Sequence, residues 1–98
     1  MSEGLTERDT QRVAELLKVL AHPIRLKIIN LLSQHRELNV TAVQEQIAIS
    51  QSLASHHLNK MNDKGILTKV RGGKEHYYSL ADPTLAEWLT LLLKIQRL

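Results

Sequence analysis

Short polar side chains gather between residues 50 and 59, at spacings that place them along one side of a predicted helix. Hydroxyl, amide and imidazole groups are the donors and acceptors that read base edges in the major groove of DNA. They do so near the N-terminus of a recognition helix, where free backbone N–H groups also attract phosphate. A solvent-exposed helix face without this function is polar too, so the pattern alone leaves both interpretations open. The polar side chains are Ser50, Gln51, Ser52, Ser55 and His56, with Asn59 nearby.

A β-hairpin is predicted directly after this helix. In residues 66–71, Ile66, Thr68 and Val70 alternate with Leu67, Lys69 and Arg71. Residues 75–80 are rich in β-prone side chains. Two glycines, at 72 and 73, permit the positive φ angles of a tight connection between them. Arg71 and Lys74 flank the tip, where their charges can reach phosphates or the minor groove. An ordinary surface hairpin carries lysines too, but the position after a polar-faced helix favours the wing of a winged helix-turn-helix.

Positive charge is concentrated in the same stretch. The chain has a formal net charge of +3, and residues 56–76 contain five basic and two acidic side chains, which accounts for the whole excess. A local basic patch is the electrostatic footprint expected for a polyanion, although a solvated lysine-bearing surface has the same composition. The basic residues are Lys60, Lys64, Lys69, Arg71 and Lys74.

The preceding sequence predicts three helices that support this module. Thr6 and Asp9 fit the cap of a helix over residues 7–20, and Pro23 suits the first turn of a second helix. Residues 34–39 are predicted to be a loop, after which Asn39 caps a short helix over residues 40–47. Apolar side chains at helical spacing give the first two helices a buried stripe, and Arg25 lies off it. The stripe consists of Val13, Leu16, Leu17, Leu20, Ile24, Ile28, Leu31 and Leu32.

A last helix is predicted to begin with Asp82 as its N-cap and Pro83 in its first turn. It is apolar over most of its circumference, which is more than the surface of a monomer usually exposes. One face is expected to pack on its own domain and another on a second chain; the alternative is that the helix only covers its own core. The predicted dimer-interface residues are Leu16, Leu85, Trp88, Leu89, Leu92 and Ile95.

The composition excludes several classes of protein. The 98 residues suffice for one small domain, and the absence of cysteine rules out disulfides and thiolate metal sites and fits a reducing cytoplasm. No apolar run reaches the roughly 18 residues that span a bilayer, and the polar N-terminus does not resemble a signal peptide. The histidines and serines show no metal-ligand or catalytic spacing, so we expect no metal site, no cofactor and no enzymatic activity.

Two longer segments carry a family resemblance. LLKVLAHPIRLKIINLL at residues 16–32 and ISQSLASHHLNKMNDKGILTKVRGGKEHYYSL at residues 49–80 resemble signatures of the ArsR/SmtB family of winged-helix repressors. The resemblance implies a homodimer joined through the first and last helices, which blocks transcription until an effector loosens DNA binding. It also implies that the polar side chains of residues 50–59 face the operator, with Arg71 and Lys74 at the wing. Lys60 of the same helix completes the predicted set of DNA contacts.

The sensor motifs of that family do not carry over. Asn39 and Thr41 stand where many thiolate-based metal sensors place a Cys-x-Cys pair. Asp82 remains from the Asp-x-His pair of other sensors, but Thr84, Ile95 and Leu98 occupy the remaining ligand positions. The effector is therefore left open between a small organic ligand beside the first and last helices, a metal site of unusual composition, and no effector at all.

We therefore predict a mainly α protein with a β-hairpin, a winged helix-turn-helix built from four helices, two strands and a fifth helix. Residues 1–98 form one domain, with dimerisation helices at 6–20 and 83–98, a helix-turn-helix at 40–63 and the wing at 66–80. The predicted function is a homodimeric repressor in the cytoplasm that binds double-stranded DNA at a palindromic operator. The alternative is a protein-interaction module with the same fold and no operator of its own, which weak DNA binding without sequence preference would favour.

Overall fold

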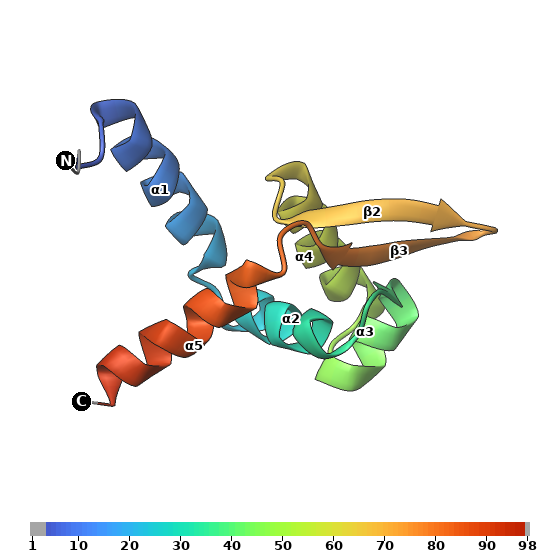
Figure 1. Cartoon of the computed structure of the whole chain (residues 1–98). Coiled ribbons are helices and arrows are strands. Elements are labelled where there is room, and N and C mark those ends of the chain that lie inside the picture. The colour runs from blue at the N-terminus through green and yellow to red at the C-terminus, as the bar shows by residue number, and fades with distance from the viewer. Residues whose placement is uncertain (1–3, 98) are drawn as a thin grey trace.

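The computed structural model of the chain describes residues 4–97. Residue 98, the predicted end of the last helix, lies outside the described residues. Five helices and three strands follow one another in the order expected of a winged helix-turn-helix, with one additional short strand (Figure 1). The elements are α1 (Glu7–Leu20), α2 (Pro23–Gln34), β1 (Leu38–Asn39), α3 (Val40–Ile47), α4 (Gln51–Asp63), β2 (Leu67–Gly72), β3 (Glu75–Leu80) and α5 (Thr84–Gln96).

The predicted cap of the first helix is confirmed, and the fourth helix has a cap of the same kind. In α1 the backbone N–H of Asp9 donates to the hydroxyl of Thr6 at 3.1 Å, and the Asp9 carboxylate accepts from the Thr6 N–H at 3.2 Å. Hydrogen bonding to the carboxylate, first from the Thr6 backbone N–H and then from the Thr6 side chain, lowers the pKa of the Asp9 carboxyl group. In α4 the hydroxyl of Ser50 accepts from the backbone N–H of Leu53 at 3.1 Å. Both helices therefore begin where local side chains satisfy their first free N–H groups.

The last helix begins one residue later than predicted, at Thr84. Pro83 occupies the N-cap position predicted for Asp82, and Asp82 precedes it. The Asp82 Oδ1 nevertheless accepts from the Thr84 backbone N–H at 3.0 Å and from the Thr84 hydroxyl at 2.8 Å. Pro83 lies between them in a helical conformation, with φ −59° and ψ −22°. The hydrogen bonds from Thr84 lower the pKa of the Asp82 carboxyl group.

The predicted loop at residues 34–39 contains a strand, so this part of the prediction is wrong. β1 pairs antiparallel with β3, placing Leu38 opposite Tyr78 and Asn39 opposite Tyr77. β3 also pairs antiparallel with β2, from Leu67 opposite Leu80 to Gly72 opposite Glu75, which gives the sheet order β1-β3-β2. The predicted hairpin is thus the larger part of a three-stranded sheet.

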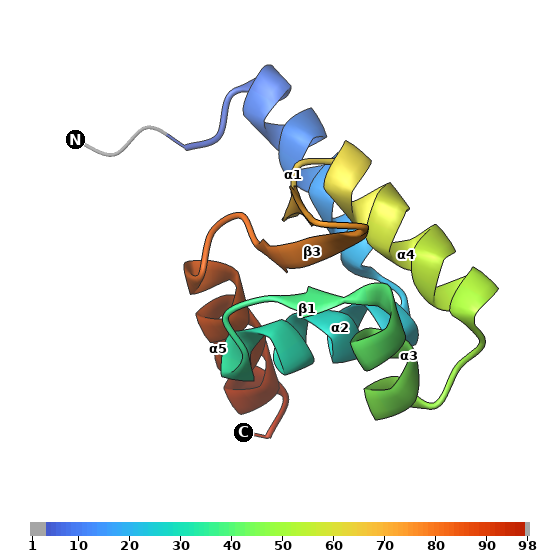
Figure 2. The same ribbon diagram turned by 90° about the vertical axis from the view of Figure 1, so that its right-hand side faces the viewer.

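A single aliphatic core joins α2, α3 and α4 to the root of the sheet. Figure 2 shows α2 and α3 below the sheet and α4 along its side. Tyr78, which is only 2% exposed, contributes a phenol ring to this core. The completely buried aliphatic side chains are Ile28, Ile29, Val43, Ala54, Leu58 and Met61.

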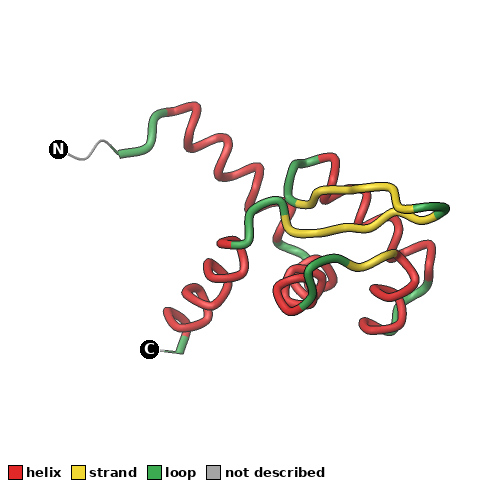
Figure 3. The backbone as a smooth tube through the Cα atoms, turned by 45° about the vertical axis from the view of Figure 1, so that its right-hand side comes forward, coloured by secondary structure: helices red, strands yellow, loops and turns green. Residues whose placement is uncertain are grey.

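The first and last helices extend away from this core on the side opposite the wing tip (Figures 1 and 3). None of the thirteen residues of α5 is fully buried, and large apolar side chains of both helices remain exposed. The molecule is accordingly elongated, with extents of 50 × 30 × 21 Å. This shape leaves apolar surface that a monomer does not cover.

Candidate nucleic-acid interface

The predicted polar side chains of α4 lie together on one surface. A shallow depression along the helix is lined by Gln51, Ser52, Ser55, His56 and Asn59. The opposite side of α4 packs into the core through Ala54, Leu58 and Met61, which follow one another at helical spacing. The helix is therefore fixed by its apolar side and presents donors and acceptors on the other.

A left-handed residue sets the direction of α4. Ala48, directly after α3, has φ 61° and ψ 53°, and its backbone N–H donates to the carbonyl of Gln44 at 2.9 Å. This conformation ends α3 and turns the chain sharply, so that Ser50 can begin α4 two residues later. The turn brings α3 and α4 side by side in the manner of a helix-turn-helix (Figure 2).

Asn59 links α4 to the wing. Its Oδ1 accepts from the hydroxyl of Tyr78 in β3 at 2.9 Å and from the ammonium group of Lys69 in β2 at 3.1 Å. Its Nδ2 donates to the hydroxyl of Ser55 at 3.3 Å. The sequence predicted Asn59 as a DNA contact, whereas the structure shows that its amide already has three partners within the protein. Lys69 and Tyr78 were not predicted, because no local pattern places them beside α4.

The wing carries its cations at an exposed tip. Arg71 Nε donates to the carbonyl of Gly73 at 3.0 Å, which folds the arginine over the tip, and Gly73 has the positive φ of 65° expected there. Next to the turn, Asn39 Nδ2 donates to Glu75 Oε1 at 2.8 Å, which ties the beginning of β3 to the start of α3. Lys74 is exposed at the same tip as Arg71.

His57 of α4 is buried beneath the polar face. It is 3% exposed, and its Nδ1 accepts a hydrogen bond from Arg25 Nε at 3.1 Å. The His22 ring lies edge-on to it, with centroids 4.4 Å apart. Burial, and then the charges of His22, Arg25 and His56, lower the pKa of His57. Arg25, which the sequence placed off the buried stripe, therefore supports the recognition helix from beneath.

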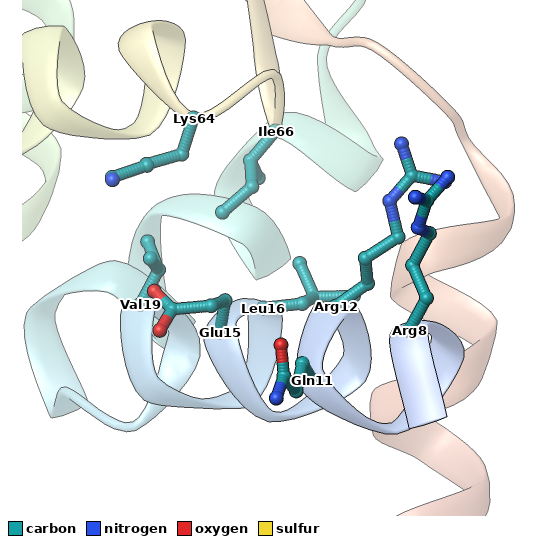
Figure 4. Close-up of a pocket in the computed structure, with 8 residues that line it drawn as sticks. All are labelled: Arg8, Gln11, Arg12, Glu15, Leu16, Val19, Lys64 and Ile66. Carbon is teal, nitrogen blue, oxygen red and sulfur yellow. The ribbon is translucent and has the colours of Figure 1, made fainter. Parts of the chain in front are cut away.

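A second hollow lies at the other end of α4 (Figure 4). Arg8 and Arg12 extend together from α1, and Lys64 reaches over the hollow from the end of α4. Its floor is apolar, formed by Leu16, Val19 and Ile66, and its volume is about 480 Å³. The 13-residue α4 is roughly 20 Å long, so this hollow is well separated from the polar residues near Ser50.

An apolar groove of about 350 Å³ runs between α1 and α5. It contains five of the six predicted interface residues, of which Leu85 and Leu89 also pack partly against the domain's own core. Leu16, Trp88 and Leu92 are 39%, 57% and 48% exposed. Ile95, the sixth predicted residue, is 65% exposed near the end of α5.

Residues 4–97 contain no cluster of three or more His, Cys, Asp or Glu side chains arranged to hold a metal ion. Within the same residues, no helix has the length and apolar character needed to cross a membrane.

Comparison with known proteins identifies the family. Residues 22–69 match the pattern of the bacterial regulatory protein, arsR family. The transcriptional repressor PagR of Bacillus anthracis is 47% identical over 83 residues, which cover 85% of this chain and 83% of PagR. The chain belongs to the ArsR family. It is a DNA-binding transcriptional repressor of that family and not an enzyme, which confirms this part of the predicted function.

Solved structures of ArsR-type proteins share the fold. The crystal structure of PagR superposes with a TM-score of 0.77 at 42% identity, covering 89% of this chain and 99% of PagR. The antimony-specific repressor AntR gives a TM-score of 0.84 at 27% identity, covering 98% of this chain and 86% of AntR. A homodimeric winged helix-turn-helix DNA-binding domain from Mycobacterium bovis gives 0.78 at 27% identity, covering 98% and 91%. The winged helix-turn-helix prediction is thereby confirmed.

Proposed function

We propose that this ArsR-family repressor acts as a homodimer that reads a palindromic operator. The observation that carries the proposal is the joint presentation of the α4 polar face and the basic wing by one rigid core. In a symmetric dimer each recognition helix occupies one half-site, and half-sites about one helical turn apart follow from the two-fold symmetry. Bacterial DNA lies in the cytoplasm, where we place the protein.

The proposed DNA contacts divide into two groups by their chemistry. Hydroxyl, amide and imidazole groups in the first turns of α4 face base edges, and cations contact phosphates, which fix the position of the protein without reading sequence. Asn59 contributes to this surface by donating a hydrogen bond to the Ser55 hydroxyl, which holds Ser55 in position. The base-facing residues are Ser50, Gln51, Ser52, Ser55 and His56, and the phosphate-facing cations are Lys60, Arg71 and Lys74.

The proposed dimer uses α1 and α5. The groove between them exposes large apolar side chains, such as Trp88 at 57% and Leu92 at 48% exposed. Burying these side chains against a second chain is favourable. The homodimeric state of the Mycobacterium bovis domain supports this assembly. An effector that shifts α1 relative to α5 would change the spacing of the two recognition helices, and the lack of cysteine directs the search to effectors that are not bound by thiolates.

Selection from random DNA fragments, followed by sequencing, tests the proposal. The purified chain is equilibrated with the fragments at two salt concentrations. We expect enrichment of an imperfect palindrome whose half-sites lie about one helical turn apart. Binding that fades as salt rises, with no enriched sequence, would show only electrostatic attraction and contradict the proposed operator.

A further inference from the structure

An unbroken chain of side-chain hydrogen bonds joins the core to the polar face of α4. It begins at Tyr78, which is 2% exposed and donates to Asn59 Oδ1 at 2.9 Å. Lys69 Nζ donates to the same oxygen at 3.1 Å. It ends where Asn59 Nδ2 donates to Ser55 Oγ at 3.3 Å, in the depression along the recognition helix.

The chemistry of the donors fixes the direction of this chain. An ammonium group has N–H donors and no acceptor, so the part of the Asn59 amide that faces Lys69 must be its oxygen. The amide NH₂ then faces Ser55. Since an amide nitrogen donates and does not accept, Ser55 Oγ must be the acceptor in this contact.

The direction determines where the Ser55 proton points. A serine hydroxyl carries one proton, and it is not used in the bond with Asn59. The hydroxyls of Thr10, Ser33 and Thr90 donate to backbone carbonyls of their own helices. Among the hydrogen bonds of the described residues, Ser55 makes no such donation. Its O–H group is therefore free to donate into the depression.

We propose that Ser55 reads the operator as a hydrogen-bond donor, so that it selects a base whose major-groove edge presents an acceptor; this rests on the proposed function. The acceptors are O6 or N7 of guanine, N7 of adenine and O4 of thymine, whereas the amino groups of cytosine and adenine are disfavoured partners. Asn59, Lys69 and Tyr78 are positioning residues that act through the hydroxyl of Ser55.

The substitution Asn59→Asp tests the proposal because it reverses the direction of the hydrogen bond between residue 59 and Ser55. A carboxylate still accepts from Tyr78 and Lys69, but it cannot donate to Ser55. The Ser55 proton then turns inward toward Asp, and oxygen lone pairs face the DNA. The two proteins are compared by selection from random DNA, and the Ser55 position in each half-site is located as the one that loses its preference in Ser55→Ala.

We expect the wild-type protein to enrich an acceptor-bearing base at that position. In Asn59→Asp the base preference at that position should change by roughly tenfold in favour of a base with an amino group, cytosine N4 or adenine N6. The preferences at the other positions should stay unchanged. The double variant Ser55→Ala/Asn59→Asp should show no preference there. Tyr78→Phe keeps the buried ring and removes one donor, so it should weaken the preference at the same position only.

Asn62→Asp is the matched control, because it adds the same charge one turn further along α4. It should lower affinity for all sequences and change no base preference. A wild-type palindrome with no change of base in Asn59→Asp would overturn the hydrogen-bond direction and leave the proposed function intact. A wild-type preference for cytosine at the Ser55 position would overturn it as well. Failure of the wild-type protein to enrich any sequence would overturn the proposed operator, and the role of Ser55 with it.

Discussion

Arg25 in α2 donates a hydrogen bond of 3.1 Å from Nε to Nδ1 of His57 in the middle of α4. The same guanidinium donates through Nη1 to the carbonyl of Val19, near the end of α1, at 3.0 Å. An arginine side chain is always a donor, so Nδ1 of His57 is the unprotonated nitrogen and the neutral ring carries its proton on Nε2. One side chain thus connects three helices and holds the recognition helix through an imidazole that must stay neutral.

This relationship predicts a loss of stability in mild acid. Burial, followed by the charges of His22, Arg25 and His56, lowers the pKa of His57 below 6.5. Between the lowered pKa and 6.5 the unfolded chain binds more protons than the folded protein, so the free energy of unfolding falls as the pH falls. Above about pH 6.5 the ring is neutral in both states and the pH has no effect through this group. Thermal unfolding from about pH 8 to about pH 5 should show the decrease.

Two variants identify the group responsible. His57→Gln keeps an acceptor for Arg25 but does not titrate, so its unfolding temperature should depend less on pH below about 6.5. His35→Gln changes an exposed histidine and should retain the wild-type dependence. Equal pH dependence in His57→Gln and the wild-type protein would show that another group causes the effect.

The turn between α3 and α4 predicts a stabilising substitution. Ala48 has φ 61°, a conformation that costs an L-residue roughly 1–2 kcal/mol and costs glycine almost nothing. Because glycine also loses more entropy on folding, Ala48→Gly should raise the free energy of unfolding by about 0.5–1 kcal/mol net. Ala14→Gly, in the interior of α1, should instead lower it by about 1 kcal/mol. Urea denaturation of both variants measures the difference, and a destabilised Ala48→Gly would contradict the expected relief of strain.

The elements fixed by neighbouring residues could be predicted from the sequence. Thr6 with Asp9 and Ser50 with Leu53 form caps between residues three apart, and the apolar side of α4 follows helical spacing. β1 could not be predicted, because two residues show no periodicity. Leu38 and Asn39 become a strand only through pairing with β3, far along the chain.

The polar residues of the candidate site could be predicted from the sequence, but the side chains that support them could not. The residue types near Ser50 pointed to base edges, and the structure places them in one depression. The support beneath them was not visible in the sequence. Arg25 and Tyr78 reach α4 from elements distant in the chain, and their meeting with His57 and Asn59 is a product of tertiary packing.

The exposed apolar surface of α5 predicts the effect of a charge at its centre. Leu92 is 48% exposed in the single chain and lines the groove between α1 and α5. Leu92→Glu should therefore keep the fold of the monomer but dissociate the proposed dimer, because the carboxylate would be buried without a partner. Val70→Glu is the control, since Val70 is 58% exposed on the wing, away from that groove, and should leave the dimer intact. Sedimentation equilibrium separates the two cases, and a wild-type protein that sediments as a monomer would contradict the proposed assembly.

The division of the DNA-binding surface into base-facing and phosphate-facing residues predicts two kinds of loss in affinity. Lys74→Ala and Arg71→Ala remove phosphate contacts, so each should weaken binding to all sequences and reduce the slope of log K against log salt by about 0.9 per half-site. His56→Ala removes a base contact, so it should cost roughly 1–3 kcal/mol on the operator, change non-specific binding little and leave the slope unchanged. Titration of each variant against operator and random DNA at several salt concentrations distinguishes these outcomes. If His56→Ala lowered the salt slope, or Lys74→Ala altered base preference, the assignment of base-facing and phosphate-facing residues would be reversed at those positions.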